Sequence, residues 1–285
     1  MTNSILPEDE STRLLYVAVN AALAAGREVM NVYQGRVDVQ WKADRSPLTE
    51  ADLRAHRVIA ERLACDSPEI PVLSEEAADI PYAARRGWSR CWLVDPLDGT
   101  KEFIKRNDEF TINIALVQDG APVAGVVHAP ALNRCWLGAV GLGAYRLEID
   151  PGGEPPGTWD ALVRGAKALP LTGHRESHRP LIVVASRSHR NAETDVFIES
   201  LRAAHPKLEL ISAGSALKLC LVAEGAADVY PRFAPTMEWD TAAGHAVCAA
   251  CGIPVRTHPG EEPLTYNKEE LLNPWFMIDA RARIV

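Results

Sequence analysis

The sequence predicts an α+β protein in which an antiparallel sheet covered by helices precedes a smaller mixed α/β unit. Helical segments come first and a meander of β-rich runs follows, which is typical of helices packed on an antiparallel sheet. Later, short apolar runs alternate with helical segments, which is typical of a parallel or mixed sheet. Residues 150–156, rich in Pro and Gly, and polar residues 172–178 separate the two parts, so the expected domains are 1–175 and 176–285.

Two helices are expected at the start of the chain. Apolar residues recur at helical spacing from Ser11, the expected N-cap, to Gly35, and acidic residues precede them. A second helix is expected from Thr49, because Thr49 and Asp52 have the spacing of a capping box. Asp119-Gly120 lies between two later β-rich runs and is a hairpin signal. The strands of this part are expected at 71–73, 91–94, 111–118, 123–129 and 135–140.

The second part is expected to alternate between strands and helices, which predicts a sheet with helices on its faces. The expected strands are 181–185, 208–211 and 227–230, and the expected helices are 191–201, 215–223 and 239–250. The stretch 150–178 contains no chemical signal, and no function is assigned to it.

Composition and charge exclude several classes of protein. The 285 residues are 47% hydrophobic and 24% charged, as in a folded globular protein, so wholesale disorder is excluded. The net charge of −8 argues against a nucleic-acid partner, because binding to nucleic acid depends on many Lys or Arg contacts to phosphates. A small anionic substrate remains compatible with this charge if metal ions meet it locally.

No stretch approaches the ~18 apolar residues that would span a bilayer. The acidic start MTNSILPEDEST is unlike a signal peptide. These features predict a cytoplasmic protein and leave open a peripheral association with the inner membrane. A homodimer is equally left open, because an apolar helix face suits either a core or a subunit contact.

Six cysteines are scattered along the chain, and without an export signal they are expected to be reduced. Cys248 and Cys251 form a C-x-x-C motif, which occurs in redox and zinc sites. However, there is no second pair, and the Ala-rich context closed by Gly252 favours two core residues on a packed helix.

The segment WLVDPLDGTKEF, residues 92–103, is the most informative for chemistry. A buried strand delivers Asp95, and Asp98 follows at a turn where Gly99 and Thr100 open a helix. Carboxylate and carbonyl oxygens are the ligands that Mg²⁺ prefers, and backbone N–H groups at a helix start suit a phosphate. An ordinary strand–turn–helix link with Asp98 as N-cap is the alternative.

Three further acids stand at the ends of expected elements. Glu75 follows the strand at 71–73, Asp52 lies in the first turn of a helix, and Asp240 lies at the start of another. Each has an ordinary explanation: Glu75 can be solvated, Asp52 can complete the capping box, and Asp240 can favour the helix dipole.

In combination, these segments resemble the inositol monophosphatase superfamily. The motifs that carry the resemblance occur in the family's order: T-x-x-D at 49–52, E-E at 75–76, W-x-V-D-P-x-D-G-T at 92–100 and W-D-x-A-A-G at 239–244. The resemblance covers nearly the whole chain. It implies a layered αβαβα sugar-phosphatase-like fold and a lithium-sensitive phosphomonoesterase that uses two or three Mg²⁺ ions per site.

The resemblance also implies roles for particular residues. The expected metal ligands are the carboxylates of Glu75, Asp95, Asp98 and Asp240 and the carbonyl oxygen of Leu97. A water activated by the metal is expected to attack the phosphate. Thr100 and Asp52 would orient this water with Glu75 nearby, and the N–H groups of Gly99 and Thr100 would cradle the phosphate.

Finer motifs are similar to the 3'(2'),5'-bisphosphate nucleotidase branch, which hydrolyses 3'-phosphoadenosine 5'-phosphate (PAP) to AMP and phosphate in sulfur metabolism. They are KEF at 101–103, SRSH at 186–189, GSALK at 214–218, AEG at 223–225 and YPR at 230–232. This similarity implies that the second domain reads the nucleotide. The expected substrate contacts are Gly99, Thr100, Ser186, His189, Ser215, Lys218 and Arg232, with Arg187 as an alternative cation.

Two other functions remain open at this point. An inositol or sugar-phosphate monophosphatase would use the same acids with a polyol pocket in place of adenine contacts. A non-catalytic anion-binding module on the same scaffold is the second alternative, although every acid of the motif and Thr100 are present.

Overall fold

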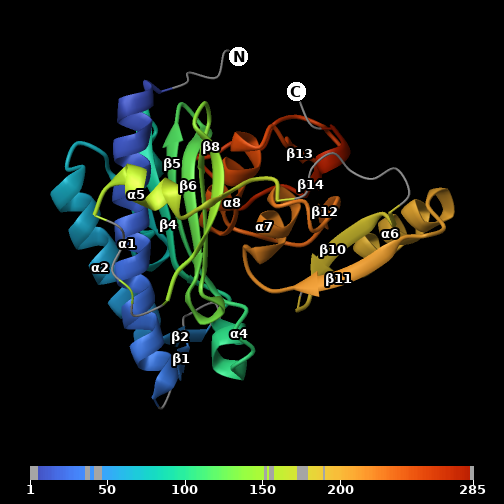
Figure 1. Cartoon of the computed structure of the whole chain (residues 1–285), viewed down its shortest axis with the longest axis horizontal. Helices are drawn as coiled ribbons and strands as arrows, with labels where there is room; N and C mark the ends of the chain where they lie inside the picture. The colour runs from blue at the N-terminus through green and yellow to red at the C-terminus, as the bar shows by residue number, and fades with distance from the viewer. Residues whose placement is uncertain are drawn as a thin grey trace.

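The computed structural model describes residues 6–35, 39–41, 47–150, 153, 157–171, 179–188 and 190–282. Five layers follow one another across the molecule (Figure 1): helices α1 and α2, a seven-stranded sheet, helices α7 and α8, a five-stranded sheet, and helix α6. This arrangement confirms the predicted layered fold. The helices are α1 (Glu8–Gln34), α2 (Glu50–Asp66), α6 (Ala192–Ala204), α7 (Leu217–Ala223) and α8 (Glu238–Ala250).

The seven-stranded sheet follows the chain in the order β3-β4-β5-β6-β7-β8-β9. Neighbouring strands are antiparallel except β3 and β4, which are parallel. Asp119 and Gly120 both have left-handed φ angles, 49° and 78°, as the predicted hairpin turn requires. The strands are β3 (Val72–Ser74), β4 (Arg90–Asp98), β5 (Thr111–Gln118), β6 (Ala121–Ala129), β7 (Arg134–Ala139), β8 (Gly143–Glu148) and β9 (Lys167–Ala168).

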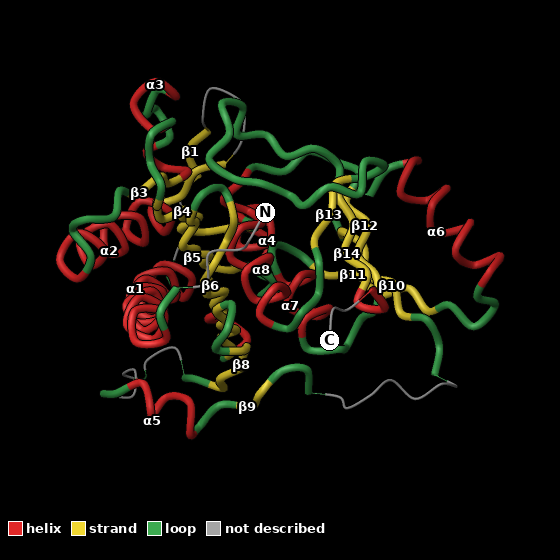
Figure 2. Tube along the Cα trace, turned by 90° about the horizontal axis from the view of Figure 1, so that it is seen from above, coloured by secondary structure: helices red, strands yellow, loops and turns green. Residues whose placement is uncertain are grey.

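Helices α1 and α2 lie side by side on one face of this sheet (Figure 2). The predicted N-cap of α1 was wrong: the helix begins at Glu8, and Ser11 lies inside it with its Oγ 3.5 Å from the carbonyl oxygen of Leu6. The acidic residues belong to the first turn rather than to a preceding loop, because negative side chains are favourable at the positive end of the helix dipole. The capping box of α2 is confirmed, since Thr49 N donates to Asp52 Oδ2 at 2.7 Å.

The five-stranded sheet has the order β11-β10-β12-β14-β13. β10 is parallel to β11 and β12, whereas β14 is antiparallel to β12 and β13, so the sheet is mixed as predicted. Sequence analysis missed the last two strands. The strands are β10 (Ile182–Ser186), β11 (Glu209–Ala213), β12 (Val229–Arg232), β13 (Val255–Thr257) and β14 (Phe276–Asp279).

Several short elements complete the described part of the chain. They are β1 (Val39–Trp41), β2 (Pro47–Thr49), α3 (Tyr82–Arg85), α4 (Thr100–Lys105), α5 (Trp159–Arg164) and the 3₁₀ turns η1 (Glu75–Ala77), η2 (Pro130–Leu132) and η3 (Ala280–Ala282). No helix in the described ranges combines the length and apolar character needed to cross a membrane.

Helix α8 packs closely on the seven-stranded sheet, although it follows β12 in the chain. A Cβ built on Gly125 of β6 would lie 2.5 Å from the carbonyl oxygen of Ala243, so this approach requires glycine. The same helix contacts α7 and β13 on the side of the second sheet. Helix α8 therefore packs against strands of both sheets, and the expected domain division at residue 175 stays a prediction. Cys248 and Cys251 are buried free thiols at the end of α8, as the packing interpretation predicted.

Candidate active site

The motif at 92–100 forms a strand, an irregular turn and a short helix. β4 is buried along most of its length, and its pairing with β5 shifts register between Asp95 and Asp98. Leu97 N donates to Asp95 Oδ1 at 3.0 Å, which fixes the first carboxylate. Gly99, with φ +89°, is the residue before α4. The alternative in which the Asp98 side chain caps the helix was therefore wrong, since Gly99 occupies that position.

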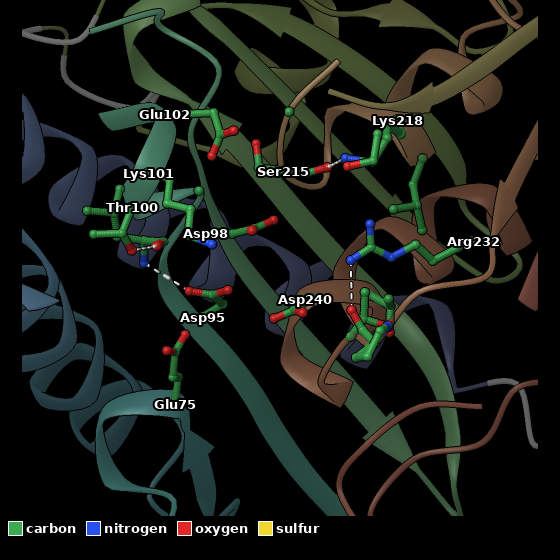
Figure 3. A pocket seen from close by; sticks show the side chains of 18 of the residues that line it. Glu75, Asp95, Asp98, Thr100, Lys101, Glu102, Ser215, Lys218, Arg232 and Asp240 are labelled. Carbon is green, nitrogen blue, oxygen red and sulfur yellow. Dashed lines mark hydrogen bonds between the residues drawn. The ribbon is translucent and has the colours of Figure 1, made fainter. Parts of the chain in front are cut away.

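One cavity collects most of the residues that the sequence analysis singled out (Figure 3). The expected carboxylates come from η1, β4 and α8, and the expected cations come from α7 and β12. Asp52 lies behind Thr100 and outside the lining, and His189 lies outside the described residues. The predicted residues that line the cavity are Glu75, Asp95, Leu97, Asp98, Gly99, Thr100, Ser186, Ser215, Lys218, Arg232 and Asp240.

The carboxylates at one end of the cavity are crowded: Asp95 is buried, and Glu75, Asp98 and Asp240 are half-buried. Burial raises the pKa of Asp95 well above its ordinary value, and the charges of Glu75, Asp98 and Asp240 raise it further. Burial and the charge of Asp98 raise the pKa of Asp240 to about 8. Burial likewise raises the pKa of Asp98 to about 6, although Lys218 and Asn113 oppose this change. Such a cluster is unfavourable when ionised unless a cation compensates it.

A divalent cation fits this set of donors. Carboxylate and carbonyl oxygens are hard ligands of the kind that Mg²⁺ takes, and a cation would offset the repulsion that raises these pKa values. Within the described part of the chain, no three carboxylate, imidazole or thiol groups form a closed metal cluster. The individual metal ligands therefore stay predictions.

Asn113 is a site residue that the sequence analysis missed. It lies on β5 opposite Asp95, and its Nδ2 donates to Asp98 Oδ2 at 3.3 Å. This bond orients one of the expected metal ligands, as partners of metal-binding carboxylates commonly do. The available signal was one amide inside the otherwise apolar run INIALV.

Thr100 and Asp52 form the predicted hydroxyl–carboxylate contact. Thr100 Oγ1 lies 3.4 Å from Asp52 Oδ1 and 3.3 Å from the carbonyl oxygen of Leu97. The other oxygen of Asp52 accepts from Thr49 N and Thr49 Oγ1 within the capping box. Burial raises the pKa of Asp52 to about 6, and the bonds from Thr49 oppose this shift.

The opposite end of the cavity is cationic (Figure 3). Lys218 is buried, and its Nζ donates to the carbonyl oxygens of Ser215 at 2.5 Å and Ala213 at 3.3 Å. Arg232 Nη2 donates to the carbonyl oxygen of Pro235, while its buried Nε has no hydrogen-bond partner among the described residues. Both cations thus retain donors for an anion, since an ammonium has three N–H groups and a guanidinium has five.

Arg187, the alternative cation, lies outside the cavity lining. It makes a two-bond ion pair with Glu109, with Nε and Nη2 each 2.8 Å from a carboxylate oxygen. This ion pair joins two loops, and the expected role of Arg187 in substrate binding stays a prediction.

Comparison with known proteins places this geometry in a family. A model of the Inositol monophosphatase family matches residues 10–279. The chain is 47% identical over 258 residues to the 3'(2'),5'-bisphosphate nucleotidase CysQ of Shigella flexneri, with 89% of this chain and 94% of that protein covered. It is 46% identical, with the same coverage, to the protein of that name from Escherichia coli strain K12.

Solved structures agree with these relatives. CysQ from Bacteroides thetaiotaomicron, described as a bacterial member of the inositol monophosphatase family, matches with a TM-score of 0.86 and 49% identity, covering 95% of this chain and 98% of that chain. An IMPase from Thermotoga maritima matches with a TM-score of 0.69 at 24% identity, covering 94% of this chain and 92% of that chain, which supports the fold alone. The chain therefore belongs to the inositol monophosphatase family.

Proposed function

We propose that the protein is a Mg²⁺-dependent phosphomonoesterase that hydrolyses PAP to AMP and phosphate. The observation that carries this proposal is one cavity with crowded carboxylates and a backbone turn at one end and two cations at the other. The acidic end suits metal-assisted hydrolysis of a phosphate, and the cationic end suits a second phosphate. The relatives named 3'(2'),5'-bisphosphate nucleotidase support the same substrate.

Two or three Mg²⁺ ions would be held by Glu75, Asp95, Asp98, Asp240 and the carbonyl oxygen of Leu97. When bound, Mg²⁺ supplies positive charge that stabilises the transferring phosphoryl group and promotes ionisation of water. The acids of this chain would contribute the ligand oxygens, and partial exclusion of water from the cavity would strengthen those charge interactions. The family is generally Mg²⁺-dependent, which agrees with this assignment.

Thr100 and Asp52 would orient the attacking water. The Thr100 hydroxyl donates toward Asp52, which leaves its oxygen lone pairs to accept a hydrogen bond from water. A threonine alone is too weak a base, and the carboxylate behind it makes proton transfer effective. The backbone N–H groups of Gly99 and Thr100 would cradle the scissile phosphate.

Lys218, Arg232, Ser186 and Ser215 would bind the 5'-phosphate and the nucleoside. Ser215 Oγ donates to the carbonyl oxygen of Glu109, so its hydroxyl proton is already used within the protein. Binding energy from this remote phosphate would contribute to rate, because it positions the reacting 3'-phosphate.

Lys218→Met is expected to lower kcat/KM for PAP by roughly tenfold to a hundredfold, because a charge-assisted bond contributes about 1.5–3 kcal/mol. The loss with 3'-AMP, which lacks the second phosphate, should be at most a few-fold. Methionine retains the volume of the buried side chain, so the fold should survive. Initial rates of phosphate release from both nucleotides measure the effect.

Lys167→Met is a suitable control. Lys167 lies on β9, an edge strand of the seven-stranded sheet, where it is exposed and paired with Glu148. It should leave both rates unchanged. Equal losses with PAP and 3'-AMP in Lys218→Met would show that Lys218 does not read the second phosphate.

A further inference from the structure

Three loops meet at Glu109, a residue just before β5 that does not line the cavity. Its Oε2 accepts from Gly214 N at 2.9 Å and from Arg187 Nε at 2.8 Å, and its Oε1 accepts from Arg187 Nη2 at 2.8 Å. Its backbone carbonyl accepts from Ser215 Oγ at 2.8 Å. Glu109, in the loop that leads into β5 of the first sheet, therefore contacts two loops of the second sheet. One loop follows β10, and the other connects β11 to α7.

The packing around Glu109 is tight on both sides. A Cβ built on Gly214 would lie 2.8 Å from the Glu109 carbonyl oxygen, and one on Gly99 would lie 3.2 Å from the same oxygen. Gly99 opens the turn expected to cradle the scissile phosphate, whereas Gly214 precedes the turn that leads to Lys218. Glu109 thus sits between the two turns and contacts both.

The position of the Lys218 ammonium depends on the same turn. Its Nζ donates to the carbonyl oxygens of Ala213 and Ser215, the residues on either side of Gly214. Ser215 has φ +38°, a backbone conformation that is costly for a residue with a side chain. The bond from Ser215 Oγ to the Glu109 carbonyl and the bond from Gly214 N to its carboxylate stabilise this conformation.

We propose that Glu109, together with Arg187, is a positioning residue that sets the spacing between the Gly99–Thr100 turn and Lys218 and thereby selects substrates with a second phosphate. This inference rests on the proposed function for the identity of the substrate. A second phosphate contributes to rate only if both phosphates reach their sites in one pose. A displacement of about 1 Å at such a contact can cost on the order of a hundredfold in rate.

Glu109→Gln tests this assignment with little change in volume. The amide oxygen of glutamine can take the place of Oε2, but the amide nitrogen is a donor and cannot accept from Arg187 Nη2 as Oε1 does. One bond from Arg187 is therefore replaced by a donor–donor contact, and the charge pairing with Arg187 is lost. We expect kcat/KM for PAP to fall about tenfold to a hundredfold, while kcat/KM for 3'-AMP changes less than about threefold. Thermal stabilisation by Mg²⁺ should equal that of the wild type, because no expected metal ligand is altered.

A double-mutant cycle separates positioning from a general structural effect. If Glu109 acts through Lys218, the PAP-specific losses of Glu109→Gln and Lys218→Met should not add, because contacting residues in one network are coupled. Asp279→Asn is a matched control. Asp279, on β14, likewise pairs with an arginine, Arg281, and its side chain is 19% exposed compared with 20% for Glu109. This control should leave the ratio of kcat/KM for PAP to kcat/KM for 3'-AMP unchanged.

The outcomes distinguish this assignment from the proposed function. Two results would overturn the positioning role and leave the proposed function intact, provided that the wild type prefers PAP. One is an equal loss of kcat/KM for PAP and 3'-AMP in Glu109→Gln, and the other is full additivity of the losses caused by Glu109→Gln and Lys218→Met. If the wild type hydrolyses PAP and 3'-AMP equally well, selection for a second phosphate is overturned while PAP hydrolysis stands. If the wild type does not hydrolyse PAP, the proposed function itself fails. Should Glu109→Gln not fold, Arg187→Met replaces it, because the Arg187 side chain is 48% exposed and its pairing tests the same contact.

Discussion

Asp95→Asn is expected to abolish phosphate release from PAP, with a loss of at least about a thousandfold, or roughly 4 kcal/mol in transition-state stabilisation. Asp95 is buried and lies among the carboxylates expected to hold the metal ions. An amide oxygen is a neutral and weaker ligand, so the site would lose part of the negative charge that would hold the metal ions. The measurement is phosphate release at saturating Mg²⁺.

The same variant is expected to fold. Asparagine Oδ1 can still accept the hydrogen bond from Leu97 N, and removing a charge from a buried acidic cluster does not weaken it. The metal-free melting temperature should therefore be no lower than that of the wild type, whereas stabilisation by Mg²⁺ should be much reduced. Asp160→Asn, on the exposed side of α5, should change neither quantity. Turnover retained in folded Asp95→Asn would contradict the assignment of the metal site.

Thr100→Val is expected to lower kcat for PAP by about a hundredfold to a thousandfold, the range typical of a group that assists proton transfer. Valine has nearly the shape of threonine but cannot donate to Asp52 or accept from water. The KM and the stabilisation by Mg²⁺ should change little, because neither depends on the hydroxyl in this account. Thr100→Ser, which retains the hydroxyl, is the control and should recover most of the rate.

A Thr100→Val variant with kcat within a few-fold of the wild type would remove Thr100 from the proposed mechanism. Asp52→Asn would be a less clear test. Asp52 also accepts two bonds from Thr49 in the capping box, and the loss of a helix cap costs about 1 kcal/mol in stability.

Features with a local signal could be predicted from the sequence. The capping box at Thr49 and Asp52 and the hairpin at Asp119-Gly120 both depend on residues a few positions apart, and both are confirmed. The acidic motif at 92–100 was predicted for the same reason, because a strand end and a glycine turn place its carboxylates together. The predicted N-cap of α1 was wrong, because the local sequence is compatible with a helix that begins at Ser11 or at the acids before it.

Features that depend on distant parts of the chain could not be predicted. β14 pairs with β12 and β13 over long separations, and the four residues of β14 carry no strong periodic pattern. The contact of Glu109 with Arg187 and Gly214 joins residues 78 and 105 positions away. The motif analysis placed Arg187 near the substrate, but only the folded arrangement shows that Glu109 already pairs with it.

The most direct test of the proposed function is phosphate release from PAP and from inositol 1-phosphate, measured side by side with Mg²⁺, without Mg²⁺ and with added Li⁺. The account predicts turnover that requires Mg²⁺, is inhibited by Li⁺ and strongly favours PAP. Preference for inositol 1-phosphate, or no turnover of either compound in folded protein with Mg²⁺, would contradict it.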